Sequence, residues 1–462
     1  MLRRKIENYF NEWMKNRKTA LLVKGARQVG KTYSIDHFIT KSFKHIIKID
    51  FARRTDLIDS FVQFNNYEQL LIRLSAIDGA NLIPKETVVF FDEIQLVYKR
   101  REELIKKNLV DPISMDLLTA IKPLVIENNY HYILSGSLLG VNINNVVLNP
   151  TGYLDVVTMF PLDFEEYLMA KNVGDNVILY LKECFINKEK VDDEVHKIIL
   201  ENFHEYVLIG GMPQAVTEFI SNKNLYNVEQ TQLQIINQYT LDITKYIDEE
   251  IKRLRIREIY RAIPSEINSK NKRFMASHIL TKSELNRLNI IDEFLWLTNA
   301  GIAIPVFNVS EVELPLQLTI ERKTMKLFMN DIGLLDTMLV SSDIRNKLLN
   351  KEKDINYGAP FENVCAQELI AHGFSESLYY YNSKKHGEVD FIIEYNGNVL
   401  PIEIKSGKPN EMSIYNHMAL NNVVKIYDIK EAYVFGETNY IRENDIIHQF
   451  PIYMISFIKK NW

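Results

Sequence analysis

The chain has 462 residues, of which 46% are apolar and 25% are charged, as in ordinary soluble globular proteins. A chain of this length is too long to fold around a single hydrophobic core, which suggests about three domains. The net charge is −5, which excludes a global basic field that would attract nucleic acid. Any nucleic-acid binding would therefore need a local patch.

The sequence shows no targeting or membrane segment. The N-terminal residues lack the apolar core of a signal peptide, and no apolar run is long enough to span a bilayer. We therefore expect a cytoplasmic protein without a membrane partner. Cys184 and Cys365 belong to no CxxC or Cys/His cluster, so two buried, reduced thiols are expected rather than a zinc site.

Helical and strand patterns alternate over the first 170 residues. An amphipathic helix is expected at residues 1–18, and further helices follow at 31–42, 66–77 and 116–128. Buried strands are expected between them, at 19–25, 44–51, 86–93, 131–137 and 154–162. This alternation predicts an α/β fold with a parallel sheet.

After residue 164, the predicted secondary structure changes twice along the chain. Residues 164–252 have an almost wholly helical pattern, interrupted at 210–213. Residues 253–325 predict short helices and then two strands, at 303–309 and 314–321. From about residue 355, a helix at 362–373 precedes three strand patterns and two further α/β units.

The strand at 19–25 leads into a segment that fits the P-loop pattern GxxxxGK[ST]. Its glycines allow successive N–H groups to point at phosphates, and the following helix adds the positive end of its dipole. Lys31 would reach the β- and γ-phosphates, and Thr32 would ligate Mg²⁺. We therefore expect ATP and Mg²⁺ here, with nucleotide contacts from Gly25, Ala26, Arg27, Gln28, Val29, Gly30, Lys31 and Thr32. The alternative is a glycine turn that merely contains Lys-Thr.

Two acids end the apolar run at 88–91. Asp92 would hold Mg²⁺ through water, and Glu93 would polarise the water that attacks the γ-phosphate. Glu93 and Lys31 are therefore the expected catalytic residues. Such an acidic pair is weak evidence alone. After a P-loop, and with the strand at 44–51 between the two motifs, it is typical of the additional-strand class of P-loop ATPases.

A polar tip also ends the strand at 131–137. Ser135 would lie beside the acidic pair and sense the γ-phosphate, as a sensor residue does in AAA-type ATPases. The alternative is a simple serine–glycine turn. The sequence singles out no arginine finger.

Several short segments carry a family resemblance: GARQVGKT (25–32), FFDEIQ (90–95), ILSGS (133–137), FPLDFEEYL (160–168), GGMP (210–213), LDITKY (241–246), KLFMNDIGLL (326–335), FENVCAQEL (361–369), GEVDFII (387–393) and PIEIKSG (401–407). Together they cover almost the whole chain, which resembles the prokaryotic AAA-type ATPases with a nuclease-like C-terminal domain. One departure is Gly152-Tyr153, where that family commonly has Gly-Arg. A role for that arginine in nucleotide sensing or in a partner subunit is therefore in doubt here.

The resemblance implies a P-loop sheet, a helical or winged-helix middle and a C-terminal restriction-endonuclease-like α/β domain. Combined with the patterns above, it gives four expected regions. They are a P-loop AAA-type ATPase core (1–170), a helical lid region (171–252), a winged-helix-like region (253–340) and a PD-(D/E)xK nuclease-like domain (341–462).

Four residues of the last region form a candidate nuclease site. Glu403 and Lys405 point to the same face of a strand, and a hairpin around residues 395–398 would place Asp390 beside them. Glu362, on the preceding helix, would add a further carboxylate. Two carboxylates, a metal and a lysine suit Mg²⁺-dependent phosphodiester cleavage. The alternative is a hairpin with solvated charges, although Glu403 and Lys405 interrupt an apolar run.

Residues 252–273 are rich in Lys and Arg and form a candidate DNA contact, together with the C-terminal domain. Acids are interspersed, so a solvated helix face is equally compatible. The first hypothesis is an ATPase that couples ATP hydrolysis to movement of a nuclease-like domain on DNA. The alternative is a nucleotide-controlled switch that binds a protein partner through an inactive nuclease-like module.

Overall fold

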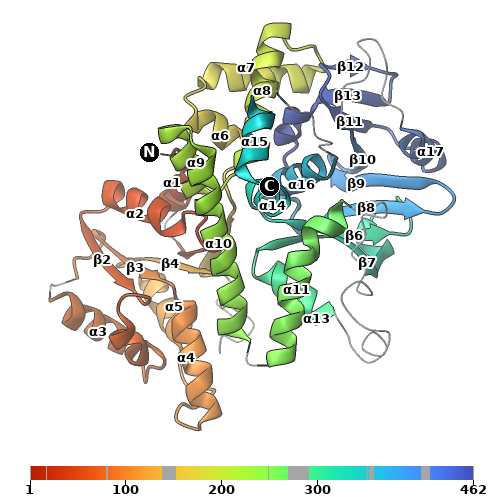
Figure 1. Ribbon diagram of the computed structural model, residues 1–462. Helices are drawn as coiled ribbons and strands as arrows, with labels where there is room; N and C mark the ends of the chain where they lie inside the picture. Colours follow the sequence, from red (N-terminus) through yellow and green to blue (C-terminus); the bar gives the residue numbers. More distant parts are fainter. Residues whose placement is uncertain are drawn as a thin grey trace. The chain divides into compact units, whose positions relative to one another are not determined.

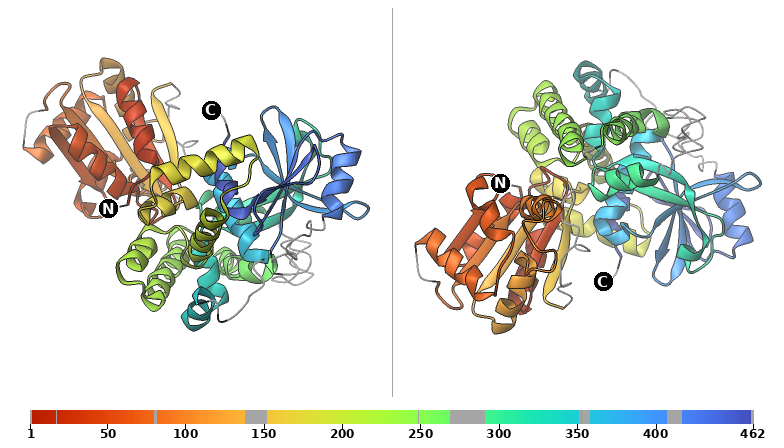
Figure 2. Two further views of the ribbon diagram at one scale, coloured as in Figure 1. Left: turned by 90° about the horizontal axis from the view of Figure 1, so that it is seen from above. Right: turned by 90° about the horizontal axis from the view of Figure 1, so that it is seen from below.

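The chain forms two compact units (Figure 1, Figure 2). One comprises Arg4–Phe160 with Asn299–Gly301, and the other comprises Met1–Arg3, Pro161–Thr298 and Ile302–Trp462. The first unit thus ends at Phe160 rather than at residue 170. The computed structural model describes residues 2–16, 18–79, 82–137, 152–247, 249–268, 291–350, 352, 358–406 and 417–460.

The first unit, red to orange in Figure 1, contains a five-stranded sheet of order β2-β3-β4-β1-β5 in which every pair is parallel. The strands are β1 (Ala20–Gly25), β2 (His45–Asp50), β3 (Thr87–Asp92), β4 (His131–Ser137) and β5 (Leu154–Met159). The predicted α/β class with a parallel sheet is confirmed. The strand that separates β1 from β3 is β4, whereas β2 pairs on the outer side of β3. The additional strand is therefore 131–137, not 44–51 as we expected.

Helices cover both faces of this sheet. One face packs on α3 (Glu68–Asp78), α4 (Gln95–Lys106) and α5 (Leu117–Glu127) in a single apolar cluster. The other face is covered by α1 (Ile6–Asn16) and α2 (Lys31–Ser42). Trp13 on α1 and Phe43, the residue after α2, both contact the ring of His131. Because both faces are covered, β3 is buried along its whole length, which explains its continuous apolar sequence.

The second unit, yellow to blue in Figure 1, begins with a helical part. Asp163 opens it as the N-cap of a capping box with Glu166. The described helices before its sheet are α6 (Phe164–Ala170), α7 (Asp175–Asn187), α8 (Asp193–Ile209), α9 (Pro213–Asn222), α10 (Leu225–Tyr246), α11 (Glu250–Ile267) and α13 (Ile291–Asn299). The helical pattern predicted after residue 164 is therefore confirmed over the described residues.

The second unit also contains an eight-stranded mixed sheet of order β12-β13-β11-β10-β9-β8-β6-β7. Its strands are β6 (Ala303–Val309), β7 (Ile320–Met329), β8 (Leu378–Ser383), β9 (Gly387–Tyr395), β10 (Asn398–Ile404), β11 (Ala432–Gly436), β12 (Ile441–Arg442) and β13 (Ile447–Pro451). β6 and β7, expected in a separate winged-helix-like region, extend this sheet. A boundary at 340/341 would therefore divide one continuous sheet.

The strand predicted at 314–321 begins later than expected. Residues Leu316–Thr319 form a 3-10 turn, η4, and β7 follows from Ile320. The apolar residues of 314–321 therefore belong partly to the 3-10 turn and partly to the first residues of β7. Between β7 and β8 lie α14 (Ile332–Leu339), α15 (Ser342–Leu349), α16 (Gly358–Leu369) and the π-helical turn η5 (Ile370–Phe374).

The central strands of the second sheet and two helices follow one another along the chain in the order helix, three-stranded meander, helix, strand. α16 precedes the antiparallel strands β8, β9 and β10, and α17 (Met418–Ile426) then leads to β11, which pairs parallel with β10. The predicted hairpin between β9 and β10 is confirmed, with Asn398 opposite Tyr395. Its turn residues Asn396 and Gly397 both have positive φ, as the tightest hairpin turns require.

Buried polar contacts tie distant segments of the second unit together. The Glu368 carboxylate on α16 accepts hydrogen bonds from the Phe164 N–H and from the Ser456 hydroxyl, both at 2.8 Å. At Gly211, a Cβ would lie 2.0 Å from the Leu162 carbonyl oxygen, so a side chain does not fit there. These contacts give FPLDFEEYL and GGMP a structural role.

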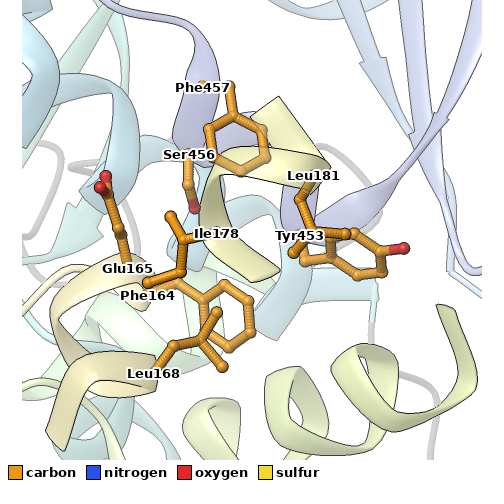
Figure 3. A pocket seen from close by; sticks show the side chains of 8 residues that line it. All are labelled: Phe164, Glu165, Leu168, Ile178, Leu181, Tyr453, Ser456 and Phe457. Atoms are coloured by element: carbon orange, nitrogen blue, oxygen red, sulfur yellow. The ribbon is translucent and has the colours of Figure 1, made fainter. Parts of the chain in front are cut away.

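The C-terminal turn η6 (Ile452–Phe457) packs against α6 and α7 around a small apolar pocket (Figure 3). The cavity has a volume of about 10 Å³, roughly the space that one water molecule needs, which is too small for a ligand. It therefore belongs to the packing of the unit. Its lining residues are Phe164, Glu165, Leu168, Ile178, Leu181, Tyr453, Ser456 and Phe457.

Cys184 and Cys365 are both buried and free, as expected. Among the described helices, none is both long and apolar enough to cross a bilayer.

Arg345 on α15 generates a stability prediction. It is fully buried; its guanidinium donates to Gln232 and Thr337 at 3.0 Å and lies 3.0 Å from the Asp336 carboxylate. Arg345→Met should lower the free energy of unfolding of this unit by about 3–5 kcal/mol, because it strands a buried carboxylate.

The control is the pair Arg345→Met/Asp336→Asn, which removes both charges. Urea denaturation should show a smaller loss for the pair than the sum of the two single losses. Additive losses would contradict direct coupling between the two groups.

Candidate functional site

The P-loop lies between the carboxyl end of β1 and the first residue of α2. Gly30 precedes the helix with φ 95°, and Gln28 also has a positive φ. At Gly25 a Cβ would lie 2.3 Å from the Met159 carbonyl oxygen on β5, so the close pairing of β1 and β5 requires glycine there. The backbone therefore has the tight turn that a phosphate cradle needs.

An arginine that the sequence did not single out supports this loop. The buried Arg4 side chain donates to the carbonyl oxygens of Val29 at 2.8 Å and Phe160 at 2.7 Å. These bonds join the far side of the P-loop to the residue after β5. No motif contains Arg4, so only the fold could reveal its position.

Lys31 is buried at the start of α2. Its ammonium donates to the carbonyl oxygens of Gly25 at 3.1 Å and Ala26 at 2.8 Å. Burial lowers the pKa of Lys31 to about 8, although the nearby acids Glu93 and Asp92 oppose the shift. The ammonium thus lies folded against its own loop, within reach of a group placed on that loop.

Asp92, at the carboxyl end of β3, connects two strands and one helix of the site. It accepts hydrogen bonds from the Thr32 hydroxyl at 2.8 Å and from the Ser135 hydroxyl on β4. Burial raises the pKa of Asp92, while these two hydroxyls oppose the rise. The predicted metal-binding pair, Thr32 and Asp92, and the predicted sensor Ser135 are therefore brought together.

Glu93 follows with a positive φ of 59°, an uncommon conformation for this residue type. Its backbone N–H donates to Asp92 at 3.1 Å. Its carboxylate accepts a hydrogen bond from the side-chain amide of Gln95, which is fully buried. The Gln95 oxygen in turn accepts from the Ser137 N–H at 3.2 Å, so Gln95 ties Glu93 to the tip of β4.

Gln95 and Asp50 are two further polar residues of this site that sequence reasoning missed. Asp50 ends β2 opposite Asp92 in the sheet register. The same signal that revealed Asp92, an acid directly after a buried strand, would have revealed Asp50. Gln95 lies inside the FFDEIQ segment but carried no assigned role.

The donor set fits a magnesium nucleotide. Hard oxygen groups from Thr32 and Asp92 suit Mg²⁺, which binds to proteins through few side chains and retains water. When bound, Mg²⁺ would withdraw charge from the phosphate oxygens. Lys31 and the loop N–H groups would hold the triphosphate, and Glu93 would hold a water for attack.

The candidate nuclease residues also come close together, within the second unit. Asp390 on β9 accepts from the Ile404 N–H at 2.9 Å, and Glu403 lies 2.7 Å from the Lys405 ammonium. Burial and the charge of Asp390 raise the pKa of Glu403 to about 8, and Lys405 opposes the rise. These acids are buried, so they are not the solvated outer face of a hairpin.

A second lysine that we did not predict, Lys326 on β7, enters this cluster. Its ammonium lies 2.7 Å from Glu388, 3.6 Å from Glu362 and 3.8 Å from Asp390. Burial lowers the pKa of Lys326, but these carboxylates outweigh it and raise the pKa overall. Among the described residues, no three His, Cys, Asp or Glu side chains are arranged to hold a metal.

The basic stretch is only partly described, because Lys270, Lys272 and Arg273 lie outside the described residues. In the described part, which forms α11, Arg255 lies 3.7 Å from Glu293 and Arg261 lies 3.5 Å from Glu258. The Arg255–Glu293 pair is largely buried between α11 and α13, whereas the Arg261–Glu258 pair is exposed to solvent.

Residues 17–168 match the model of an AAA domain. Together with the parallel sheet and the P-loop, this match defines this part of the chain as a P-loop ATPase domain of the AAA type. Residues 200–345 and 357–455 match two models described as domains of unknown function, DUF8612 and DUF4143. A search of curated proteins finds no match.

Solved structures with similarity to the chain include a Walker-type ATPase, a branch migration motor and an ORC protein. The Walker-type ATPase PabY2304 of Pyrococcus abyssi is 15% identical, with 74% of this chain and 96% of that chain covered and a TM-score of 0.39. The RuvB branch migration motor of Thermotoga maritima is 13% identical, with 64% and 87% covered and a TM-score of 0.28. The ORC2 protein of Aeropyrum pernix in its ADP form is 12% identical, with 76% and 95% covered and a TM-score of 0.28. At these identities and TM-scores, the similarities assign no function to this chain.

The position of Lys31 predicts how nucleotide affinity depends on pH. A bound triphosphate favours the ammonium form, so binding should raise the pKa of Lys31 above its value of about 8. Affinity for ATP should therefore be constant below that pH and fall above it, by up to about tenfold per pH unit. The phosphates are fully ionised there, because their second pKa is about 6.

Calorimetric titration of ATP between about pH 7 and about pH 9.5 measures this dependence. The control is Lys31→Arg, which keeps its charge and should show no such fall whatever its affinity. An affinity of the unaltered protein that stays flat over the whole range would contradict the lowered pKa.

Proposed function

We propose that this protein hydrolyses ATP with Mg²⁺ and uses its nucleotide state to control the second unit. The observation that carries the ATPase part is the meeting of Lys31, Thr32, Asp92 and Ser135 at the carboxyl ends of neighbouring parallel strands. Ligands of open parallel sheets bind at this edge. In the proposal, Glu93 orients and activates the attacking water, and Gln95 holds Glu93 in place.

The second unit, in our proposal, contains a restriction-endonuclease-like domain. The support is the succession of α16, the β8–β10 meander, α17 and the parallel strand β11, with Asp390, Glu403 and Lys405 around the β9–β10 hairpin. This succession agrees with the family resemblance of the sequence. Nuclease-like folds are often retained as binding modules, so the fold alone assigns no cleavage.

Two functions of the second unit are compatible with this fold, and the described charges favour binding over cleavage. A buried lysine, Lys326, already lies among the carboxylates of Glu362, Glu388 and Asp390, and two α11 arginines are paired with acids. We therefore propose a nucleotide-controlled switch whose nuclease-like module recognises a protein partner. Action on DNA is the second candidate, favoured by the proximity of Asp390, Glu403 and Lys405.

The ATPase proposal predicts a separation of binding from turnover. Glu93→Gln should retain ATP affinity within a few-fold and lower kcat by about 10²–10⁴-fold, because the water loses its base. Lys31→Ala should abolish ATP binding. Phosphate release and nucleotide affinity, measured side by side, check both.

The matched control is Glu103→Gln, an exposed acid on α4, which should leave turnover unchanged. Wild-type turnover by Glu93→Gln would remove Glu93 as the base. Absence of ATP binding by the unaltered protein would remove the ATPase proposal altogether.

The binding-module proposal predicts no plasmid cleavage by the full chain with Mg²⁺, with or without ATP. Asp390→Ala should behave in the same way, since no metal chemistry depends on Asp390 in this proposal. Mg²⁺-dependent cleavage that disappears in Asp390→Ala would establish the DNA function instead. Tight, salt-dependent DNA affinity would also favour DNA over a protein partner.

A further inference from the structure

Lys326 lies in the middle of a cluster of carboxylates in the second unit, which we call the carboxylate cluster. Its side chain is 1% exposed, and its ammonium has three carboxylates within 4 Å, those of Glu362, Glu388 and Asp390. Glu388 and Asp390 point to the same face of β9 because they are two residues apart, and Glu362 approaches from α16. Three acids from two elements therefore converge on one ammonium.

The aromatic ring of Tyr380 on β8 forms a further wall of this position. The Lys326 ammonium lies 5.0 Å from the centre of that ring, within the range of a cation–π contact. Ring and carboxylates together favour a cation at this point. A buried ammonium with such partners needs no water and no metal to balance its charge.

The remaining oxygens of the cluster are partly engaged elsewhere. One Asp390 oxygen accepts from the Ile404 N–H at 2.9 Å, and Glu388 also accepts a hydrogen bond from the Asn382 side chain. Mg²⁺ requires oxygen ligands at about 2.0–2.1 Å in near-octahedral geometry. An ammonium between these oxygens blocks that geometry sterically and repels a second cation.

The lysine of the nuclease-like motif is a different one. The Lys405 ammonium lies 2.7 Å from the Glu403 carboxylate. The Lys405 side chain is 23% exposed, so it lies at the rim of the cluster. Lys326 instead comes from β7, the edge strand next to β6 in the sheet. The two lysines therefore have separate places, one at the rim and one among the acids.

We propose that the ammonium of Lys326 is the resident cation of this cluster and excludes the divalent metal that a nuclease-like site would use. This inference rests on the proposed nuclease-like fold of the second unit. It gives a physical reason for a binding module: the carboxylates are retained, but a covalently attached cation occupies the position between them. Phosphodiester cleavage through a metal-activated water then has no place to occur.

Mn²⁺ titration of the full, nucleotide-free chain tests this, with free Mn²⁺ followed by electron paramagnetic resonance. Lys326→Met keeps the length of the side chain and removes its charge. It should bind one Mn²⁺ more per chain than the unaltered protein, with an affinity at least about tenfold tighter than any that the unaltered cluster shows. Mn²⁺ held by the ATPase site is common to all variants and drops out of the comparison.

The charge-matched control is Lys430→Met, which removes an exposed lysine paired with Asp428 and should bind no additional Mn²⁺. A second variant, Lys326→Met/Glu388→Gln, removes one charge of each sign and so keeps the net charge. It should fold and still gain Mn²⁺ binding. The gain should disappear when Asp390→Asn is added to either variant.

Two results would overturn the proposal. One is Mn²⁺ binding by the unaltered protein that is lost in Asp390→Asn, because the metal would then share the cluster with Lys326. The other is a folded Lys326→Met or double variant without additional Mn²⁺. ATP turnover, measured in the same samples, separates this outcome from a failure of the ATPase proposal, which would remove turnover without changing the Mn²⁺ difference.

Discussion

The site depends on one buried carboxylate, that of Asp92. It lies at the end of β3 and accepts hydroxyl hydrogen bonds from α2 through Thr32 and from β4 through Ser135. Because β4 is the neighbour of β3 in the sheet, Ser135 reaches Asp92 from the adjacent strand. Thr32 reaches it from α2, the helix that follows β1. One polar group therefore connects α2, β3 and β4.

Local signals made the ATPase half predictable from the sequence. The P-loop spacing, the acids after the apolar strand and the polar tip at Ser135 each follow from backbone geometry over a few residues. Arg4 was not predictable, because its contacts with Val29 and Phe160 depend on how the chain closes after β5. The sheet order was missed for the same reason, since sequence order does not fix which strand lies between two others.

In the C-terminal half, the hairpin and the proximity of Asp390 to Glu403 followed from strand periodicity and a turn sequence. Lys326 did not, because it reaches the cluster from a strand more than fifty residues earlier in the chain, through sheet pairing that no local pattern encodes. In our proposal, the single ammonium of Lys326 turns a metal-site motif into a buried ion cluster. A motif therefore predicts chemistry only when its neighbours in space are known.

The most direct measurement is a crystal structure of the full chain with Mg²⁺ and a non-hydrolysable ATP analogue. We predict that the Lys31 ammonium leaves the Gly25 and Ala26 carbonyls for the terminal phosphates. The metal should lie about 2.1 Å from the Thr32 hydroxyl oxygen, with Asp92 behind its water ligands. An analogue bound elsewhere, with Lys31 still folded on its own loop, would contradict the account.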